Sequence, residues 1–193
     1  MRMRKVLGRR PRATEKKASM ALIVGREQDK ALLQAAAGRR GAVLLTGEEY
    51  LTGGVRLRAR SRYLNLCAVE DYQSQGYYVS LIGQARGHNV LPTIDTLTRL
   101  GQKRLYREDL ATLTALLAKA EVPETASSKR TVEVYFGQAR EAWARRLGQE
   151  AFKRFPAPVL ELELRRSASG WTVGQVWPQE QQLLPGDGIG PEV

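Results

Sequence analysis

A run of polar residues and glycine over 70–76 has the composition of a ligand-binding turn. An apolar segment that predicts a buried strand comes before the run, and an amphipathic segment that predicts a helix comes after it. In α/β folds, ligands bind where a helix begins beside the carboxyl end of a parallel strand, because free N–H groups and the helix dipole face that crevice. The candidate ligand-binding residues are the glycine and the hydrogen-bonding residues of this turn and of the segments on either side of it: Asn65, Tyr72, Gln73, Ser74, Gly76 and Tyr77.

The same turn also has a purely structural interpretation. Ser74 or Asp71 could cap the helix that follows, since serine and aspartate are favoured at that position. Gly76 could pack against the sheet, and the tyrosines could fill the core. For each residue taken alone, this structural role is the more common one.

Alternating arginines suggest a second kind of site. Alternate side chains of an extended strand share one face, so four arginines spaced two apart would form a row that contacts phosphates. This nucleic-acid alternative lacks a recognised binding motif or a stacking platform beside the row. Its residues are Arg56, Arg58, Arg60 and Arg62.

The net charge of +11 is concentrated at the start of the chain. Residues 1–19 hold eight basic residues and one acidic residue, a net charge of +7, which leaves +4 for the other 174 residues. Such a composition predicts a disordered tail. A basic arm of this kind could also hold nucleic acid through phosphate contacts, and Met20 could be the true start of the protein.

Few residues here are suited to metal binding or nucleophilic catalysis. The single cysteine, Cys67, excludes an internal disulfide, and its place in a buried strand is typical of a small hydrophobic residue. The single histidine, His88, is expected to interact with carbonyls at the end of the preceding helix. The acidic pairs Glu48–Glu49 and Glu70–Asp71 are expected in solvated loops. We therefore expect no catalytic residue and no metal, and a small enzyme built around the turn is the weakest hypothesis.

The pattern of apolar residues predicts an α/β protein. We expect a mixed sheet with a Rossmann-like parallel β-α-β first half, an antiparallel hairpin at the C-terminal end, and helices packed on it. The expected strands are 20–24, 42–46, 63–69, 88–92, 131–136, 159–164 and 171–177. The expected helices are 28–37, 74–86, 107–120 and 138–155. The second of these helices carries one apolar stripe, formed by Tyr77, Tyr78, Leu81, Ile82 and Ala85.

This pattern also sets the expected domain boundaries. A basic tail over 1–19 precedes a single α/β domain over 20–178, and a flexible tail covers 179–193. No segment is long and apolar enough to cross a bilayer. We expect a cytoplasmic protein that makes no membrane contact.

Several short motifs resemble the RimK-like ATP-grasp N-terminal domain family. The most specific is the Tyr-Gln-Ser block at 72–74, and the resemblance runs from Met20 to near Pro178. The other matching motifs are Asn65–Cys67, Gly76–Leu81, Ala85–His88, Val90–Pro92, Ile94, Leu105–Tyr106, Val134–Gly137 and Phe155–Pro156.

The resemblance implies a partner and not a reaction. Members of this family carry the domain ahead of an ATP-grasp ligase, which activates a carboxylate as an acyl phosphate and joins it to an amine. We expect no room for such a unit in these 193 residues. ATP and magnesium are expected only in an associated ATP-grasp unit, and none in this chain. The expected partner is an ATP-grasp ligase or a self-association partner.

Overall fold

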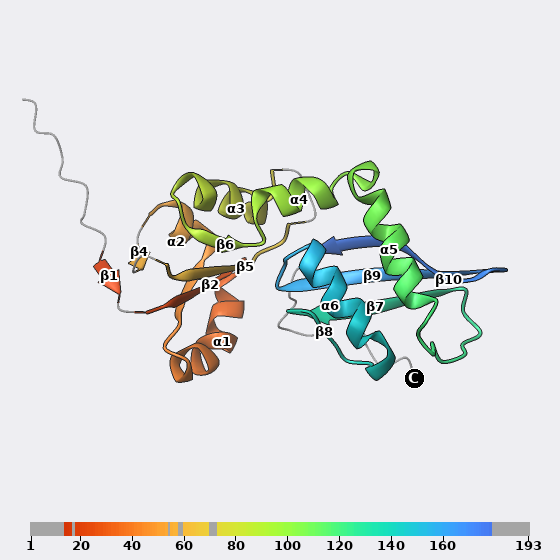
Figure 1. Ribbon diagram of the computed structural model, residues 1–193. Helices are drawn as coiled ribbons and strands as arrows, with labels where there is room; N and C mark the ends of the chain where they lie inside the picture. The colour runs from red at the N-terminus through yellow and green to blue at the C-terminus, as the bar shows by residue number, and fades with distance from the viewer. Residues whose placement is uncertain (1–13, 17, 54, 58–59, 70–72, 179–193) are drawn as a thin grey trace, which may run out of the picture.

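The computed structural model describes residues 14–16, 18–53, 55–57, 60–69 and 73–178. Two four-stranded sheets, each with its own helices, make up most of this part of the chain (Figure 1). The expected α/β class, with a parallel first half and an antiparallel second half, is confirmed. The halves form two sheets and not one continuous mixed sheet, because two helices intervene after the last parallel strand and the next strand starts a new core.

The first sheet is parallel, with strand order β3-β2-β5-β6. Its strands are nearly continuous apolar runs, as expected of strands whose two faces are both covered. Their bounds are β2 (Met20–Val24), β3 (Val43–Thr46), β5 (Arg62–Leu66) and β6 (Asn89–Leu91). The chain moves from β2 outward to β3 and then returns to the other side of β2, so the topological switch point lies between β2 and β5.

Helices cover both faces of this sheet (Figure 1). Helix α1 (Glu27–Arg39) packs on β2 and β3 from one side. Helix α2 (Gly47–Leu51) and helix α3 (Gln75–Ala85) pack against each other on the opposite side. The sheet encloses one of the two hydrophobic cores with helices α2 and α3, which contribute Tyr50 and Val79 to it.

Helix α3 presents its small residues to the sheet and not the predicted apolar stripe. Tyr78 and Leu81, which belong to that stripe, are 38% and 36% exposed. The buried residues of the helix are Gly76, Val79, Ser80 and Gly83. A Cβ at Gly83 would lie 2.3 Å from a methyl group of Val90, so the glycine allows the helix to approach β6 closely. The prediction was wrong because close packing favoured small side chains over apolar ones.

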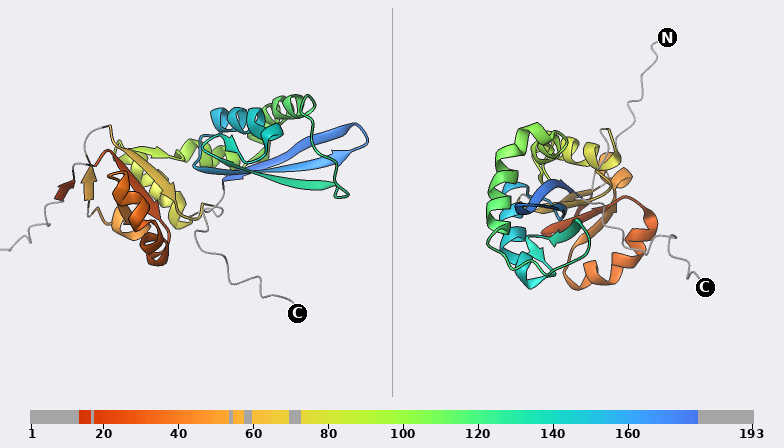
Figure 2. Two further views of the ribbon diagram at one scale, coloured as in Figure 1. Left: turned by 90° about the horizontal axis from the view of Figure 1, so that it is seen from below. Right: turned by 90° about the vertical axis from the view of Figure 1, so that its right-hand side faces the viewer.

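The second sheet is antiparallel, with strand order β10-β9-β7-β8. Helices α5 (Arg107–Leu117) and α6 (Arg145–Arg154) cover one face, as Figure 2 shows from below. The alternating leucines of β9 are fully buried in the second hydrophobic core. The strand bounds are β7 (Lys129–Tyr135), β8 (Gln138–Ala139), β9 (Val159–Ser167) and β10 (Gly170–Pro178).

Short elements complete the second half. Helix α4 (Ile94–Leu100) and the 3-10 helix η1 (Lys103–Tyr106) lead from the first sheet into α5. The helix predicted over 138–155 begins only after the 3-10 helix η2 (Ala142–Ala144). Its first residues form β8 instead, because the positive φ angles of Phe136 (49°) and Gly137 (82°) turn the chain back in a two-residue hairpin.

A small third pairing lies near the start of the chain. Strand β1 (Thr14–Lys16) pairs in parallel with β4 (Val55–Leu57). β1 falls within the segment expected as a basic tail, whereas most of that segment and all of the tail expected over 179–193 lie outside the described residues. The single domain over 20–178 stays a prediction.

Two side chains from the helical layer form hydrogen bonds with the backbone of the edge strand β10. The hydroxyl of buried Tyr106 donates a hydrogen bond to the carbonyl of Val176 (3.2 Å). The Val173 N–H donates to the hydroxyl of Thr114 (3.0 Å). Two edge groups that another strand could pair with are therefore occupied within the chain.

The Thr114 contact can be tested by an isosteric change. Thr114→Val removes the acceptor and leaves the Val173 N–H unpaired, so the free energy of unfolding should fall by about 1–2 kcal/mol. Thr112→Val is the matched control, since the Thr112 hydroxyl bonds only to Glu108 of its own helix. Its effect should stay within about 0.5 kcal/mol in urea denaturation. Equal losses in the two variants would contradict the role given to Thr114.

Candidate functional site at the carboxyl edge of the parallel sheet

The candidate site lies at the carboxyl edge of the first sheet, beside the switch point between β2 and β5. The chain enters β2 from the side of β1, so the carboxyl ends of the strands point toward the second sheet (Figure 1). The turn predicted to bind a ligand follows β5 and leads into α3. Its position is therefore the one expected for ligand binding in an open α/β sheet.

Asn65 is buried at this edge, and its side-chain amide forms hydrogen bonds within the protein. Its side chain is 3% exposed, and its Nδ2 donates hydrogen bonds to the carbonyl of Gly76 (2.7 Å) and the hydroxyl of Ser80 (3.0 Å). Its Oδ1 accepts a hydrogen bond from the N–H of Cys67 (3.2 Å). Both amide hydrogens and the oxygen have partners within the protein, so Asn65 fastens α3 to β5.

The hydrogen bonds continue from Asn65 to the end of β6. The fully buried hydroxyl of Ser80 donates to the carbonyl of Pro92 (2.7 Å). The chain of bonds thus joins β5, α3 and the loop after β6 inside the core. Satisfied polar networks of this kind fix one arrangement of the elements that they connect.

Ser74 and Gly76 have the structural roles of the more common interpretation. The Ser74 hydroxyl caps α3 by accepting a hydrogen bond from the N–H of Tyr77 (3.2 Å). The N–H of Gly76 donates to the carbonyl of Ala68 (3.0 Å), and a Cβ at this position would lie 2.3 Å from that oxygen. A glycine is needed where the helix start meets the end of β5.

Two other candidate residues of the turn, Gln73 and Tyr77, are at least partly exposed to solvent. Gln73 is exposed and has a left-handed backbone conformation, with φ at 68°. Tyr77 is half-buried, and its ring meets that of Tyr78 edge-on at 5.7 Å. Tyr72 lies outside the described residues. Gln73 is therefore the described candidate whose side chain is most accessible at this edge.

A further feature of the same edge was missed from the sequence. Glu49 was expected in a solvated loop, but it forms a capping box at the start of α2. The Thr46 hydroxyl accepts from the Glu49 N–H (3.2 Å), while the Thr46 N–H donates to the Glu49 carboxylate (2.8 Å). Lys30 of α1 donates to the same carboxylate (2.7 Å). The Thr-x-x-Glu spacing is a known signature of this cap and could have revealed it.

The Lys30–Glu49 contact predicts a pH dependence of stability. The hydrogen bonds from Lys30 and Thr46 hold the pKa of Glu49 below its ordinary value of 4.5. A carboxyl with a lowered pKa stabilises the fold fully above about pH 4.5, and that contribution is lost as the pH falls through the folded-state pKa. Because the Glu49 side chain is 46% exposed, we expect a contribution below about 1 kcal/mol.

This contribution is measured by urea denaturation between about pH 3 and pH 7, with roughly one denaturation curve every half pH unit. Glu49→Gln should flatten the acid limb of the curve, and Lys30→Met should flatten it to a smaller extent, because the Thr46 N–H still bonds to the Glu49 carboxylate. If both variants keep the slope of the unmodified protein, the capping carboxylate does not stabilise the fold in this way.

His88 belongs to an aromatic cluster at the start of β6. Its Nδ1 lies 2.8 Å from the hydroxyl of buried Tyr50, and its ring stacks on that of Tyr63 at 4.3 Å. Burial raises the pKa of both tyrosines. The backbone N–H of His88 does bond to the helix-end carbonyl of Gly83 (2.9 Å), but the imidazole ring packs elsewhere than expected. Cys67 is buried, as predicted.

The arginines of the nucleic-acid alternative do not lie along one strand. Arg56 belongs to β4 and Arg62 begins β5, whereas Arg60 lies between them in a left-handed conformation with φ at 70°. Arg58 lies outside the described residues. The described arginines do not form one extended row, because the chain turns at Arg60.

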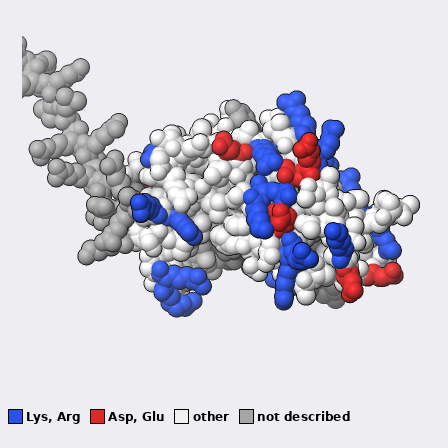
Figure 3. Space-filling model, in the orientation of Figure 1, with Lys and Arg blue, Asp and Glu red and all other residues white. Residues whose placement is uncertain are grey.

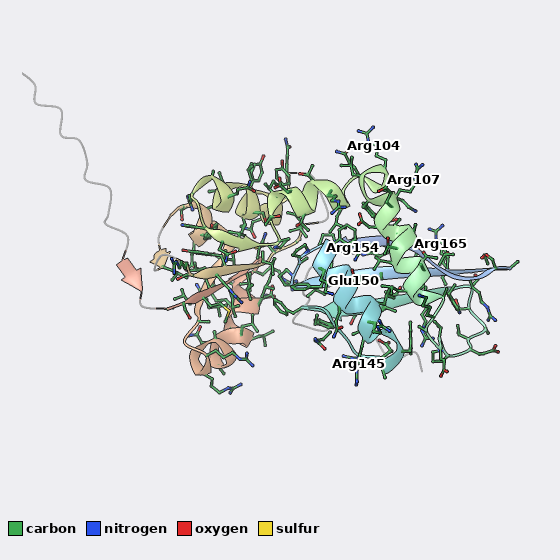
Figure 4. The ribbon with its side chains drawn as sticks, viewed as in Figure 1. Arg104, Arg107, Arg145, Glu150, Arg154 and Arg165 are labelled. Carbon is green, nitrogen blue, oxygen red and sulfur yellow. The ribbon has the colours of Figure 1, made fainter. Side chains whose placement is uncertain are left out.

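Basic side chains on the helices of the second sheet alternate with acidic ones (Figure 3). Arg154 of α6 forms ion pairs with Glu150, one turn earlier, and with Asp109 of α5 (3.3 Å), and Figure 4 shows Arg154 beside Glu150. Asp109 also accepts from Arg99 of α4 (2.5 Å). The carboxylates thus join three helices and offset part of the positive charge on this surface.

Over the described part of the chain, no three histidine, cysteine, aspartate or glutamate side chains gather as a metal site would require. None of the helices described is both long and apolar enough to span a bilayer.

Comparisons with known proteins place the chain among ligase-associated domains. The sequence pattern of the family described as RimK-like ATPgrasp N-terminal domain matches residues 47–187. The search of curated proteins returned no match. The family match spans α2 to β10 and extends past the last described residue.

Two solved structures illustrate the structural comparison. N5-carboxyaminoimidazole ribonucleotide synthetase from Thermotoga maritima is 10% identical, with a TM-score of 0.48 over 82% of this chain and 68% of that one. The macrocyclase MdnB from Microcystis aeruginosa is 9% identical, with a TM-score of 0.43 over 81% of this chain and 88% of that one. At such low similarity, neither protein's activity extends to this chain.

Proposed function

This chain belongs to the family of RimK-like ATP-grasp N-terminal domains, and from that premise we propose that it is a non-catalytic accessory domain. In this proposal it recognises a substrate of a RimK-like ATP-grasp amino-acid or peptide ligase, or docks onto that ligase, in the cytoplasm. The observation that carries the proposal is the family match over residues 47–187, which includes the whole candidate turn. ATP and magnesium would belong to the associated ATP-grasp unit.

The roles of the turn residues support binding in preference to chemistry. Asn65, Ser74 and Gly76 use their polar groups or their lack of a side chain to fix α3 against β5. A rigid edge of this kind presents a partner or ligand with a surface that needs no reorganisation on binding, which reduces the entropic cost of association. The proposed contact surface is therefore the carboxyl edge around Gln73.

Direct titration tests this proposal. The purified chain is titrated calorimetrically against each ATP-grasp ligase encoded in the same genome, with and without the ligase's amino-acid or peptide substrates. We expect one ligase to bind with a Kd of about 10 µM or lower. Binding to none of them at concentrations of about 100 µM would overturn the proposal.

A single side chain tests the position of the contact. Gln73→Ala should weaken binding about fivefold, the effect of losing one hydrogen bond. Gln149→Ala is the matched control, because Gln149 is also exposed but lies on α6. A ligase that binds both variants as tightly as the unmodified chain would place its contact elsewhere.

A further inference from the structure

One face of the first sheet is only half covered by helices. Helix α1 packs on β2 and β3 from this face, whereas α2 and α3 pack on the opposite face (Figure 1). No described helix packs on the α1 face of β5 and β6 as α1 does on β2 and β3. Parallel sheets occur almost only where both faces are covered, because their strands are apolar on both sides. The half of this face over β5 and β6 therefore lacks a layer that parallel sheets normally have.

A row of leucines, one from each strand, crosses this face. The register places them side by side, and all four are half-buried. In the order of the strands β3, β2, β5 and β6, they are Leu44, Leu22, Leu64 and Leu91. The adjacent residues Tyr63 and Val90 belong to the core on the α2 and α3 side, so the leucines face the α1 side. Leu64 and Leu91 lie on the two strands that α1 does not cover.

Helix α1 itself has an apolar outer side. Asp29 and Ala37 are buried, so the side of the helix that carries them faces the sheet. Ala31 and Ala35 lie on the opposite side at 100° per residue, and both are exposed, while Leu32 on the flank is 48% exposed. A helix that is apolar all round is normally buried on more than one side. The outer side of α1 is therefore suited to packing on a second apolar layer.

The outer side of α1 and the uncovered strands fit each other in width and chemistry. A helix is about 10 Å wide, and two strands about 4.8 Å apart occupy roughly the same width. Residues 31–37 of α1 carry no charge, so a contact through them brings no like charges together although the chain carries +11. The small alanines also allow a sheet to approach closely. One helix with the properties of α1 would cover β5 and β6.

We propose that two copies of this chain associate through this face, with α1 of each copy packed on Leu64 and Leu91 of the other. The helix and the uncovered leucines lie on one face of the same chain, so a two-fold axis beside α1 forms both contacts at once. The two helices then make a shared layer between two sheets, and each helix is buried on both sides. A helix of another protein would cover the leucines but leave the outer side of α1 exposed.

Analytical ultracentrifugation of the full chain tests this association. We expect a particle of twice the chain mass of 21.5 kDa, with a Kd of about 1–10 µM. Ala35→Glu places a charge on the outer side of α1, and Leu91→Lys places one on the sheet. Each change should weaken the association about 100-fold, because it buries an unpaired charge in both contacts of the dimer. Ala115→Glu, at an exposed position of α5, is the matched control and should leave the Kd unchanged.

Mixing the two charged variants shows which surfaces meet. In a mixed dimer, the carboxylate introduced at position 35 of one copy lies against the ammonium group introduced at position 91 of the other. The second contact of that dimer is unaltered. The mixture of Ala35→Glu and Leu91→Lys should therefore regain a Kd within about tenfold of that of the unmodified chain.

Three results would overturn the proposal. The first is a monomer at a chain concentration of about 100 µM. The second is the same Kd for Ala35→Glu and Ala115→Glu, which would place the contact elsewhere. The third is a mixture that stays monomeric although circular dichroism shows both variants folded. If Leu91→Lys does not fold, the comparison of Ala35→Glu with Ala115→Glu decides the question alone. None of these results bears on the titration with ligases, because the association needs no other protein.

Discussion

Replacing Gly76 by alanine is expected to lower the free energy of unfolding by about 3 kcal/mol. The added Cβ would lie 2.3 Å from the carbonyl oxygen of Ala68 and 2.4 Å from a methyl group of Val69. The hydrogen bond from the Gly76 N–H to the same carbonyl holds the two backbones together at 3.0 Å. A backbone oxygen cannot rotate away as a flexible side chain can, so α3 must shift and lose this bond.

The control for this substitution lies in another helix of the same sheet. Gly38 is near the end of α1, and a Cβ there would meet nothing within 4 Å. Gly38→Ala should therefore stabilise the protein by about 0.5–1 kcal/mol, because alanine is the better helix former. Both effects are measured by urea denaturation. A cost of less than about 0.5 kcal/mol for Gly76→Ala would refute the close packing of α3 on β5.

Replacing Asn65 by alanine is expected to cost a similar amount, about 3 kcal/mol. The substitution leaves the Gly76 carbonyl and the Cys67 N–H without their side-chain partners in a fully packed interior. The substitution removes three hydrogen bonds at about 1 kcal/mol each, and a small cavity adds to this cost. The loss of stability should lower the urea concentration at the denaturation midpoint, with little change in the dependence of the unfolding free energy on urea concentration.

A second variant distinguishes the hydrogen-bond network from simple packing. Ser80→Ala removes the bonds to Asn65 and to the Pro92 carbonyl, so it should also destabilise the protein. Because the two side chains share one hydrogen bond, the double variant should lose about 0.5–1 kcal/mol less than the sum of the single losses. Asn89→Ala, at an exposed position that starts β6, should change stability by no more than about 0.5 kcal/mol. Additive losses at positions 65 and 80 would contradict the network.

The positions of most strands could be predicted from the sequence. The buried face of helix α3 could not be predicted. The apolar runs identified β2, β3, β9 and β10 closely, because burial of strands leaves a direct pattern in the sequence. The face of α3 was predicted wrongly because periodicity counts apolar residues and does not register close approach through glycine. Gly76 and Gly83 face the sheet although neither contributes apolar area.

Turn geometry accounts for most of the other differences. The helix predicted over 138–155 follows the apolar spacing of that segment. The positive φ at Phe136 instead makes a hairpin turn, and the sequence lacks the asparagine that usually marks such a turn. The single mixed sheet was expected because the order of strands along the chain does not reveal which strands pair. Pairing depends on contacts between residues far apart in sequence, as the interruption by α4 and α5 shows.

The place of the candidate site could be predicted, but the roles of its residues could not. The strand–turn–helix order placed the turn at the carboxyl edge of a parallel sheet, where the structure also has it. The engagement of Asn65 with Gly76 joins residues eleven positions apart and depends on how closely α3 packs. Gln73, by contrast, stays exposed and is the residue through which the proposed contact can be tested.

The most direct measurement of the accessory role is the rate of ADP release by the ATP-grasp ligase that binds this chain. We expect the chain alone to release no ADP and the mixture to show a kcat/KM for the ligase's amino-acid or peptide substrate that is higher by about threefold or more. Gln73→Ala should reduce this stimulation, whereas Gln149→Ala should leave it intact. ADP release by the chain alone, or a ligase whose kcat/KM is the same with and without the bound chain, would contradict the account.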